Sequence, residues 1–127
     1  MAVRAVRGAT TANLNEKEEI IEATKELLSE IIERNGIDIE DMIDITFTVT
    51  PDLTKAFPAL SVRKMGITDV PLIDMLAPDI EGALPKCIRT IIRFNTEKKN
   101  SQMHPVYLRG AKVLRPDIVA KEKKEGI

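Results

Sequence analysis

The chain has 127 residues, and its 19 basic and 20 acidic side chains leave a formal net charge of −1. This length fits a single domain, residues 1–127, and the balanced charge provides no field that would attract nucleic acid or an anionic membrane. The single cysteine excludes an internal disulfide. No apolar run is long enough for a membrane span or a secretory signal, so we expect a cytoplasmic globular domain without nucleic-acid or membrane partners.

The first predicted element is a short strand. Residues 2–8 alternate in character, which places Val3, Ala5 and Arg7 on one face of the strand. We expect Gly8 to end it, because glycine interrupts a strand more often than it extends one.

A long amphipathic helix follows. Asn15 is the predicted N-cap, with Glu18 as its capping-box partner at the third helical position. Isoleucine and leucine then recur at helical spacing, while glutamate and lysine occupy the other face. Asn35 and Gly36 provide a left-handed stop.

The rest of the chain switches mainly to strand patterns. Its predicted elements are strands at 41–50, 71–75, 87–94 and 106–114, and a short helix at 59–65 that Pro58 can begin. In strand 87–94, Ile88 and Ile92 share one face and Arg89 lies on the other. Residues 118–127 have little to bury and are expected to form a mobile tail. The order of elements indicates an α+β domain in which helices pack on one side of a mixed sheet.

Conventional catalytic machinery is not visible in the sequence. Cys87 lies in a predicted strand beside apolar residues, and His104 lies in a loop, so a cysteine–histidine pair is possible in space but disfavoured. There is no phosphate-binding loop and little material for a metal site.

Several arginines stand where a fold alone does not need them. Arg7 and Arg89 lie within predicted strands, Arg63 follows a short apolar segment, and Arg115 comes at the end of the last predicted strand. Each could be a structural ion-pair residue. Alternatively, several could converge on one cleft and bind a ligand with more than one carboxylate, since guanidinium groups bind carboxylates bidentately.

Four segments carry a resemblance to a known family. They are VRGATT (6–11), TPDLTKAFPA (50–59), KCIR (86–89) and VYLRGAKVLRPD (106–117), and they resemble the monofunctional bacterial chorismate mutases of the trimeric, pseudo α/β-barrel class. The resemblance implies a homotrimer whose sheets form a pseudo-barrel with active sites at the subunit interfaces. It also implies rearrangement of chorismate to prephenate, a pericyclic isomerisation in phenylalanine and tyrosine biosynthesis that needs no metal or organic cofactor.

The resemblance also implies roles for particular residues. Arg89 matches the arginine that faces the ether oxygen of chorismate, Arg7 matches a second arginine near the ring hydroxyl and carboxylates, and Tyr107 matches a tyrosine that binds a carboxylate. The other implied substrate-binding residues are Phe57, Ala59, Arg63, Leu72, Ile73, Leu114 and Arg115.

The sequence departs from the family pattern at one informative place. The glutamate that usually addresses the ring hydroxyl aligns with Ala77, and Asp74 stands where a cysteine is common. One hypothesis is that Asp74 supplies the missing anionic charge as a catalytic residue; the other is that it caps a turn. The missing glutamate also leaves open a non-catalytic alternative, a trimeric module that binds or senses an anionic metabolite.

Overall fold

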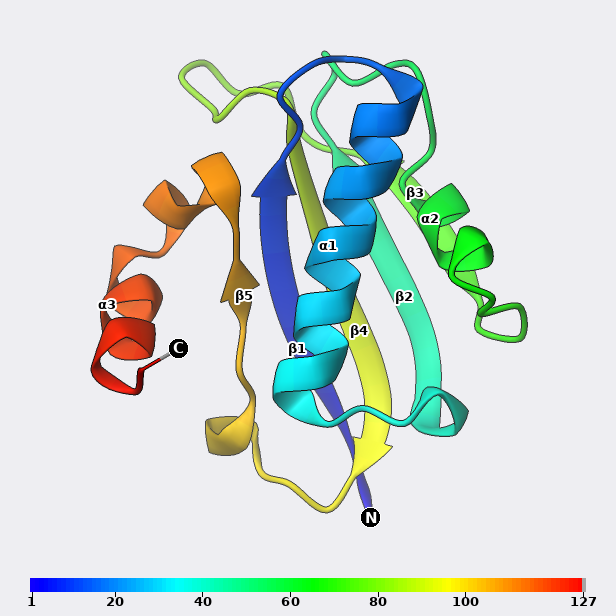
Figure 1. Cartoon of the computed structure of the whole chain (residues 1–127), viewed down its shortest axis with the longest axis vertical. Helices are drawn as coiled ribbons and strands as arrows, with labels where there is room; N and C mark the ends of the chain where they lie inside the picture. The colour runs from blue at the N-terminus through cyan, green and yellow to red at the C-terminus, as the bar shows by residue number, and fades with distance from the viewer. Residues whose placement is uncertain (127) are drawn as a thin grey trace.

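The computed structural model describes residues 1–126, in which a mixed β-sheet is covered by helices (Figure 1). The strands are β1 (Ala2–Thr11), β2 (Met42–Val49), β3 (Leu72–Leu76), β4 (Cys87–Thr96) and β5 (Val106–Tyr107). The α-helices are α1 (Lys17–Asn35), α2 (Ala59–Lys64) and α3 (Pro116–Lys124), and the 3₁₀ helices are η1 (Ile39–Asp41), η2 (Asn100–Gln102) and η3 (Arg109–Leu114).

The sheet has the strand order β3-β2-β4-β1-β5, with β4 antiparallel to both of its neighbours. The two outer pairs, β2 with β3 and β1 with β5, are parallel. The predicted mixed sheet with helices is therefore confirmed. Because β4 is central, a side chain on β4 is flanked by residues of β1 and β2: Arg89 lies between Ala9 and Thr48.

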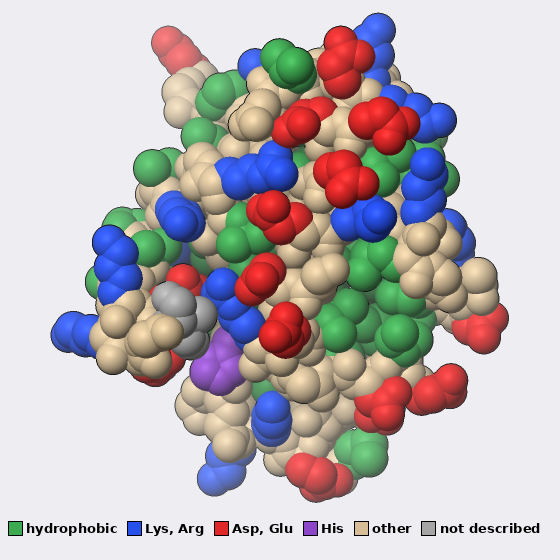
Figure 2. All heavy atoms as spheres, viewed as in Figure 1, with side chains coloured by type: hydrophobic (Ala, Val, Ile, Leu, Met, Phe, Trp, Pro, Cys, Tyr) green, Lys and Arg blue, Asp and Glu red, His purple; other side chains and the backbone are tan. Residues whose placement is uncertain are grey.

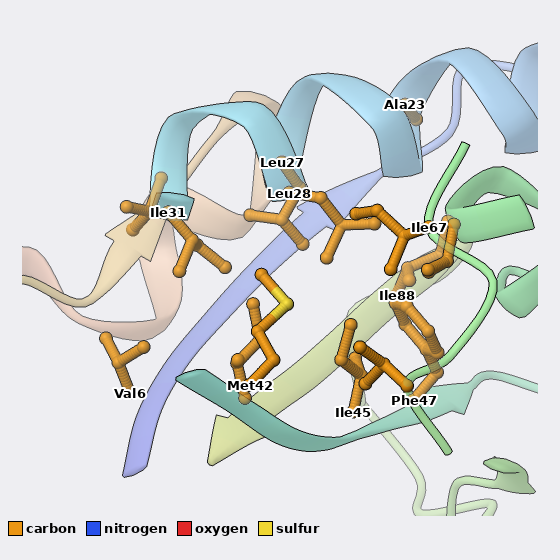
Figure 3. Close-up of a cluster of buried hydrophobic side chains, with 14 of the residues drawn as sticks. Val6, Ala23, Leu27, Leu28, Ile31, Met42, Ile45, Phe47, Ile67 and Ile88 are labelled. Carbon is orange, nitrogen blue, oxygen red and sulfur yellow. The ribbon is translucent and has the colours of Figure 1, made fainter. Parts of the chain in front are cut away.

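The core fills the space between α1 and the sheet (Figure 3). Leu27, Leu28 and Ile31 of α1 are fully buried and face Phe47 and Ile88 of the sheet. The outer surface of α1 carries acidic and basic side chains (Figure 2). This division is the one that the helical spacing predicts, since an amphipathic helix buries its apolar stripe.

Gly8 is a position where α1 and β5 approach β1 closely. A Cβ atom at this position would lie 2.8 Å from Cδ1 of Ile31 and 2.7 Å from the carbonyl oxygen of Val106. The glycine therefore admits close packing within the strand, and the prediction that it ends the strand is wrong: β1 continues to Thr11 and pairs with β4 along its whole length.

The two ends of α1 differ in how well the sequence predicts them. Gly36 stops the helix in the left-handed conformation (φ 58°, ψ 41°), as expected. The predicted capping box is wrong, because the cap is Glu16, which makes no side-chain cap hydrogen bond. The Asn15 side chain instead donates from Nδ2 to Thr54 Oγ1 and accepts the Thr54 N–H, both at 2.9 Å.

The predicted strand 106–114 is mostly wrong. β5 has two residues, after which Arg109 takes a positive φ of 52° and the chain continues as η3. Part of the tail predicted at 118–127 forms α3. The last residue of that predicted tail, 127, lies outside the described residues. Within residues 1–126, no helix combines the length and the apolar character that a membrane crossing requires.

Candidate functional site

Two arginines stand side by side on the sheet face opposite α1. Arg7 of β1 pairs with Ile91 of β4, and Arg89 of β4 pairs with Ala9 of β1, so the arginines are diagonal neighbours on adjacent strands. Both are exposed, whereas the next residue on each strand, Gly8 or Thr90, is buried. Strand alternation therefore brings two guanidinium groups to one region of the open face.

These arginines line a hollow of about 430 Å³, which we call the arginine hollow. This volume is in the range of small-molecule sites. The lining residues are Arg7, Gly8, Ala9, Thr46, Thr48, Ala77, Pro78, Arg89, Thr90, Ile91, Tyr107, Leu114 and Arg115. Five of them, Arg7, Arg89, Tyr107, Leu114 and Arg115, are predicted site residues.

The arginine hollow is electropositive. Its described lining includes three arginines and no acidic residue. Within residues 1–126, Arg7 and Arg89 form no ion pair with a carboxylate. Such a wall favours a ligand with two or more negative charges, since each guanidinium presents a planar set of donors to a carboxylate.

Arg115, at the side of the arginine hollow, already has a carboxylate partner. Its Nε and Nη2 atoms donate to the two carboxylate oxygens of Asp117 at 3.1 and 2.9 Å. This hydrogen bonding raises the pKa of Arg115 and lowers the pKa of Asp117. The pair fixes the guanidinium at the start of α3, next to the hollow that it helps to line.

A second hollow, of about 390 Å³, lies at the β3 edge of the sheet, and we call it the edge hollow. It contains the predicted residues Phe57 and Asp74, together with Lys55 and Met75. Phe57 is 72% exposed, an unusual state for a phenylalanine. The Asp74 carboxylate accepts the Ala59 N–H at 3.1 Å, and its burial raises its pKa above the ordinary aspartate value.

The four remaining predicted residues line neither hollow. Ala59 begins α2 directly after the Phe57 segment, and Leu72 packs against the core from β3. Ile73 is exposed on the open face of β3. Arg63 donates to the carbonyl oxygens of Ile67 and Val70, at 3.0 and 3.5 Å, and so braces its own loop.

Sequence reasoning did not select the threonines of the arginine hollow. Thr46 and Thr48 of β2 stand opposite Ile91 and Arg89 of β4. The alternation of strand 41–50 places both threonines on one face, but only the pairing of β2 with β4 brings that face beside Arg89. Sequence spacing alone does not contain this register.

The cysteine and histidine do not form a catalytic pair. Cys87 is buried at the start of β4, and burial raises the pKa of its thiol, which keeps it protonated and weakly nucleophilic at neutral pH. His104 lies beside α3, where its backbone N–H donates to Asn35 Oδ1. Among the described residues, no group of three or more histidine, cysteine, aspartate or glutamate side chains is placed to hold a metal ion.

Comparisons with known proteins agree with this arrangement. The family model described as chorismate mutase type I matches residues 3–118, a range that includes every residue of both hollows. The chain belongs to the chorismate mutase type I family. Family membership confirms the resemblance that the four sequence segments carry.

Proteins named as chorismate mutases align with most of the chain. The chorismate mutase AroH of Bacillus subtilis (strain 168) is 42% identical over 119 residues, 93% of this chain and 94% of that protein. The Thermus thermophilus protein of the same name is 43% identical over 117 residues, 91% and 96% of the two chains. The structure of a chorismate mutase from Clostridium thermocellum, 47% identical, superposes with a TM-score of 0.85 over 87% of this chain and 98% of that one.

Proposed function

We propose that this chain is a chorismate mutase that rearranges chorismate to prephenate in phenylalanine and tyrosine biosynthesis, in the cytoplasm and without a metal or organic cofactor. The observation that carries the proposal is the meeting of Arg7 and Arg89 in one hollow beside Tyr107. Chorismate is a dicarboxylate, and its rearrangement is pericyclic, with no covalent intermediate. A site of fixed cations without a nucleophile fits such a reaction.

The first task of the site is to select a conformer. Chorismate must be held in the compact form in which its side chain lies over the ring. Arg7, Tyr107 and Arg115, which all line the arginine hollow, are the proposed ligands of its carboxylates. Holding reacting groups together removes the entropic part of the barrier.

The second task is electrostatic. Negative charge develops on the ether oxygen as the C–O bond breaks, and Arg89 is the proposed donor to that oxygen. Its backbone is held on the central strand between Ala9 and Thr48, so the base of the side chain needs little reorganisation during the reaction. Leu114 and Ile91 add apolar side chains to the lining of the same hollow.

We further propose that three copies assemble as a homotrimer with a pseudo-barrel and that each active site combines two copies. The open face exposes apolar side chains that a monomer leaves in water, among them Val3 at 53% and Ile73 at 52%. Seven of the predicted site residues also divide between two separate hollows, five in the arginine hollow and two in the edge hollow. If the edge hollow of a neighbouring copy covered the arginine hollow, Phe57 of that copy would complete the site. The nearby predicted residues Ala59, Arg63, Leu72 and Ile73 would come with it.

Asp74 is the proposed source of the anionic charge that Ala77 lacks. Ala77 lines the arginine hollow, whereas Asp74 lies in the edge hollow, so its carboxylate would reach the ligand from the neighbouring copy. Asp74→Asn keeps an acceptor for the Ala59 N–H but removes the charge, while Asp74→Ala removes both. We expect both variants to lose kcat. If Asp74→Asn kept full kcat, the proposed charge role would be contradicted. The remaining role of Asp74 would then be to accept the Ala59 N–H at the start of α2.

The central experiment follows the loss of chorismate absorbance on addition of purified protein. Arg89→Ala is expected to lower kcat/KM by about 10²–10³-fold, the usual effect of removing one preorganised donor. Arg93→Ala is the matched control, because Arg93 lies on the same strand and face but is held by Asp44 and lines neither hollow. If the protein bound chorismate tightly without consuming it, the result would contradict the enzyme function and favour the alternative, a module that binds an anionic metabolite.

A further inference from the structure

Arg109 occupies a backbone conformation that its side chain makes unfavourable. It joins β5 to η3 with a φ of 52°, in the left-handed region that glycine adopts easily and residues with a Cβ adopt rarely. Glycine stands one residue later, at Gly110, rather than at the strained position. An arginine held there indicates that its side chain makes interactions that offset the strain.

Those interactions connect three elements. Nη1 donates to Glu19 Oε1 at 2.9 Å, and Nε lies 3.4 Å from Glu26 Oε1, so both carboxylates come from α1. Nη1 also lies 3.4 Å from the carbonyl oxygen of Thr11, the last residue of β1. The Arg109 side chain is only 27% exposed. One cation shared by two carboxylates and a carbonyl holds its geometry better than an isolated surface pair.

The adjacent backbone is fixed at the same point. The Gly110 N–H donates to Thr11 Oγ1 at 3.1 Å, and a Cβ at position 110 would lie 3.0 Å from that oxygen. Ala111 is buried against Ala9 and Tyr107. The start of η3 is thus locked to the end of β1 and to α1.

The segment held in this way forms one wall of the arginine hollow. η3 begins two residues after Tyr107, and its last residue, Leu114, lines the hollow together with Arg115, which follows it. Arg109, the first residue of η3, does not line the hollow. Glu19 and Glu26 lie on α1, which covers the other face of the sheet (Figure 1). Any effect of Arg109 on the hollow is therefore indirect and passes through the position of η3.

We propose that Arg109 is a positioning residue, which fixes η3 so that Leu114 and Arg115 form a wall ready to receive the dicarboxylate. This inference rests on the proposed function, because the wall matters only if chorismate binds the arginine hollow. The fixed wall contributes to ground-state and transition-state binding alike, so its loss raises KM and leaves kcat little changed.

The test compares Arg109→Gly, which relieves the strain and removes the ion pairs, with Arg109→Lys, which keeps the charge. We expect Arg109→Gly to raise KM for chorismate by roughly tenfold with kcat within about twofold, and Arg109→Lys to fall between it and the wild type. The double variant Glu19→Gln/Glu26→Gln should raise KM similarly and add little to Arg109→Gly. Lys25→Ala on the same helix is the control, because among residues 1–126 the ion-pair partner of Lys25 is Glu22 rather than a residue of η3 or of the hollow.

Amide hydrogen exchange supplies a readout that does not depend on turnover. Residues 109–115 should exchange faster in Arg109→Gly than in the wild type, while α1 keeps its protection. An active wild type whose KM is unchanged in Arg109→Gly overturns the inference, as does unchanged exchange in 109–115. A fall in kcat at constant KM also overturns it, since that pattern reports a loss of folded enzyme. An inactive wild type instead rejects the proposed function.

Discussion

The two faces of the sheet differ in how far their side chains are buried. On the face under α1, Phe47, Ile88 and Ile92 are fully buried and packed against the helix. On the open face, Arg89 and Ile91 of the same strand are exposed. One strand thus carries core residues and candidate site residues in strict alternation.

The buried face holds side chains that the fold needs for its stability, whereas the open face holds side chains that the fold only tolerates. Residues under α1 account for most of the burial that stabilises the chain. The arginines of the open face add no packing to the chain as described, and their mutual repulsion opposes their proximity. A surface of this kind is explained by something that comes to cover it, either a ligand or another copy of the chain.

The largest expected effect on stability comes from the covered face. Phe47→Ala should lower the free energy of unfolding by about 3–5 kcal/mol, because it removes a fully buried ring and leaves a cavity. Thr48→Ala, one residue along on the open face, should change it by less than about 0.5 kcal/mol. Urea denaturation of both variants measures the contrast, and equal losses would mean that the open face is also part of the core.

Gly8→Ala tests the close approach of α1 to β1. The added methyl group would meet Ile31 and the Val106 carbonyl, so we expect a loss of about 1–3 kcal/mol in the free energy of unfolding. Adding Ile31→Val removes the Cδ1 atom that clashes and should restore part of the loss, although the backbone contact remains. A Gly8→Ala protein as stable as the wild type would show that the helix can move away freely.

Val3→Glu tests whether the open face is covered by other copies. The side chain is 53% exposed, so the charge should change monomer stability by less than about 0.5 kcal/mol. Analytical ultracentrifugation should nevertheless show smaller assemblies than the wild type forms. Ile39→Glu, at an exposed position in η1, is the control and should leave the assembly intact. An unaltered assembly in Val3→Glu would place the subunit interface elsewhere.

The smallest expected effect concerns the pair beside the arginine hollow. Arg115 lowers the pKa of Asp117, so the carboxylate binds its proton less readily in the folded chain than in the unfolded one. The stabilisation is therefore present near neutral pH and is lost as the pH falls through the lowered pKa. Asp117→Asn should melt slightly below the wild type at pH 7, and the difference should disappear in acid. A constant difference across this range would contradict the sign.

The sequence predicted best where one local pattern decided the structure. The spacing of isoleucine and leucine in α1, and the alternation that separates Arg89 from Ile88, each follow from burial on one face. The diagonal placement of Arg7 and Arg89 could not be read in this way, because it depends on the register of β1 against β4.

The errors have the same origin in contacts between distant residues. Asn15 looks like a helix cap but is held by Thr54, 39 residues away. The segment 106–114 looks like a strand, yet β5 ends at Tyr107, and Arg109 just after it contacts two carboxylates of α1. Local propensity is a weak guide where side chains from remote segments offer stronger partners.

The position of β1 in the sheet has a consequence for how the chain is made. β1 is synthesised before the other strands, but its neighbours, β4 and β5, begin at Cys87 and Val106. At roughly 5–20 residues per second, a ribosome needs on the order of ten seconds to supply these partners. During that delay the nascent β1 can pack against α1 but cannot complete its ladder. The high contact order of the central strands predicts that the sheet closes late, only after the residues of β5 have been made.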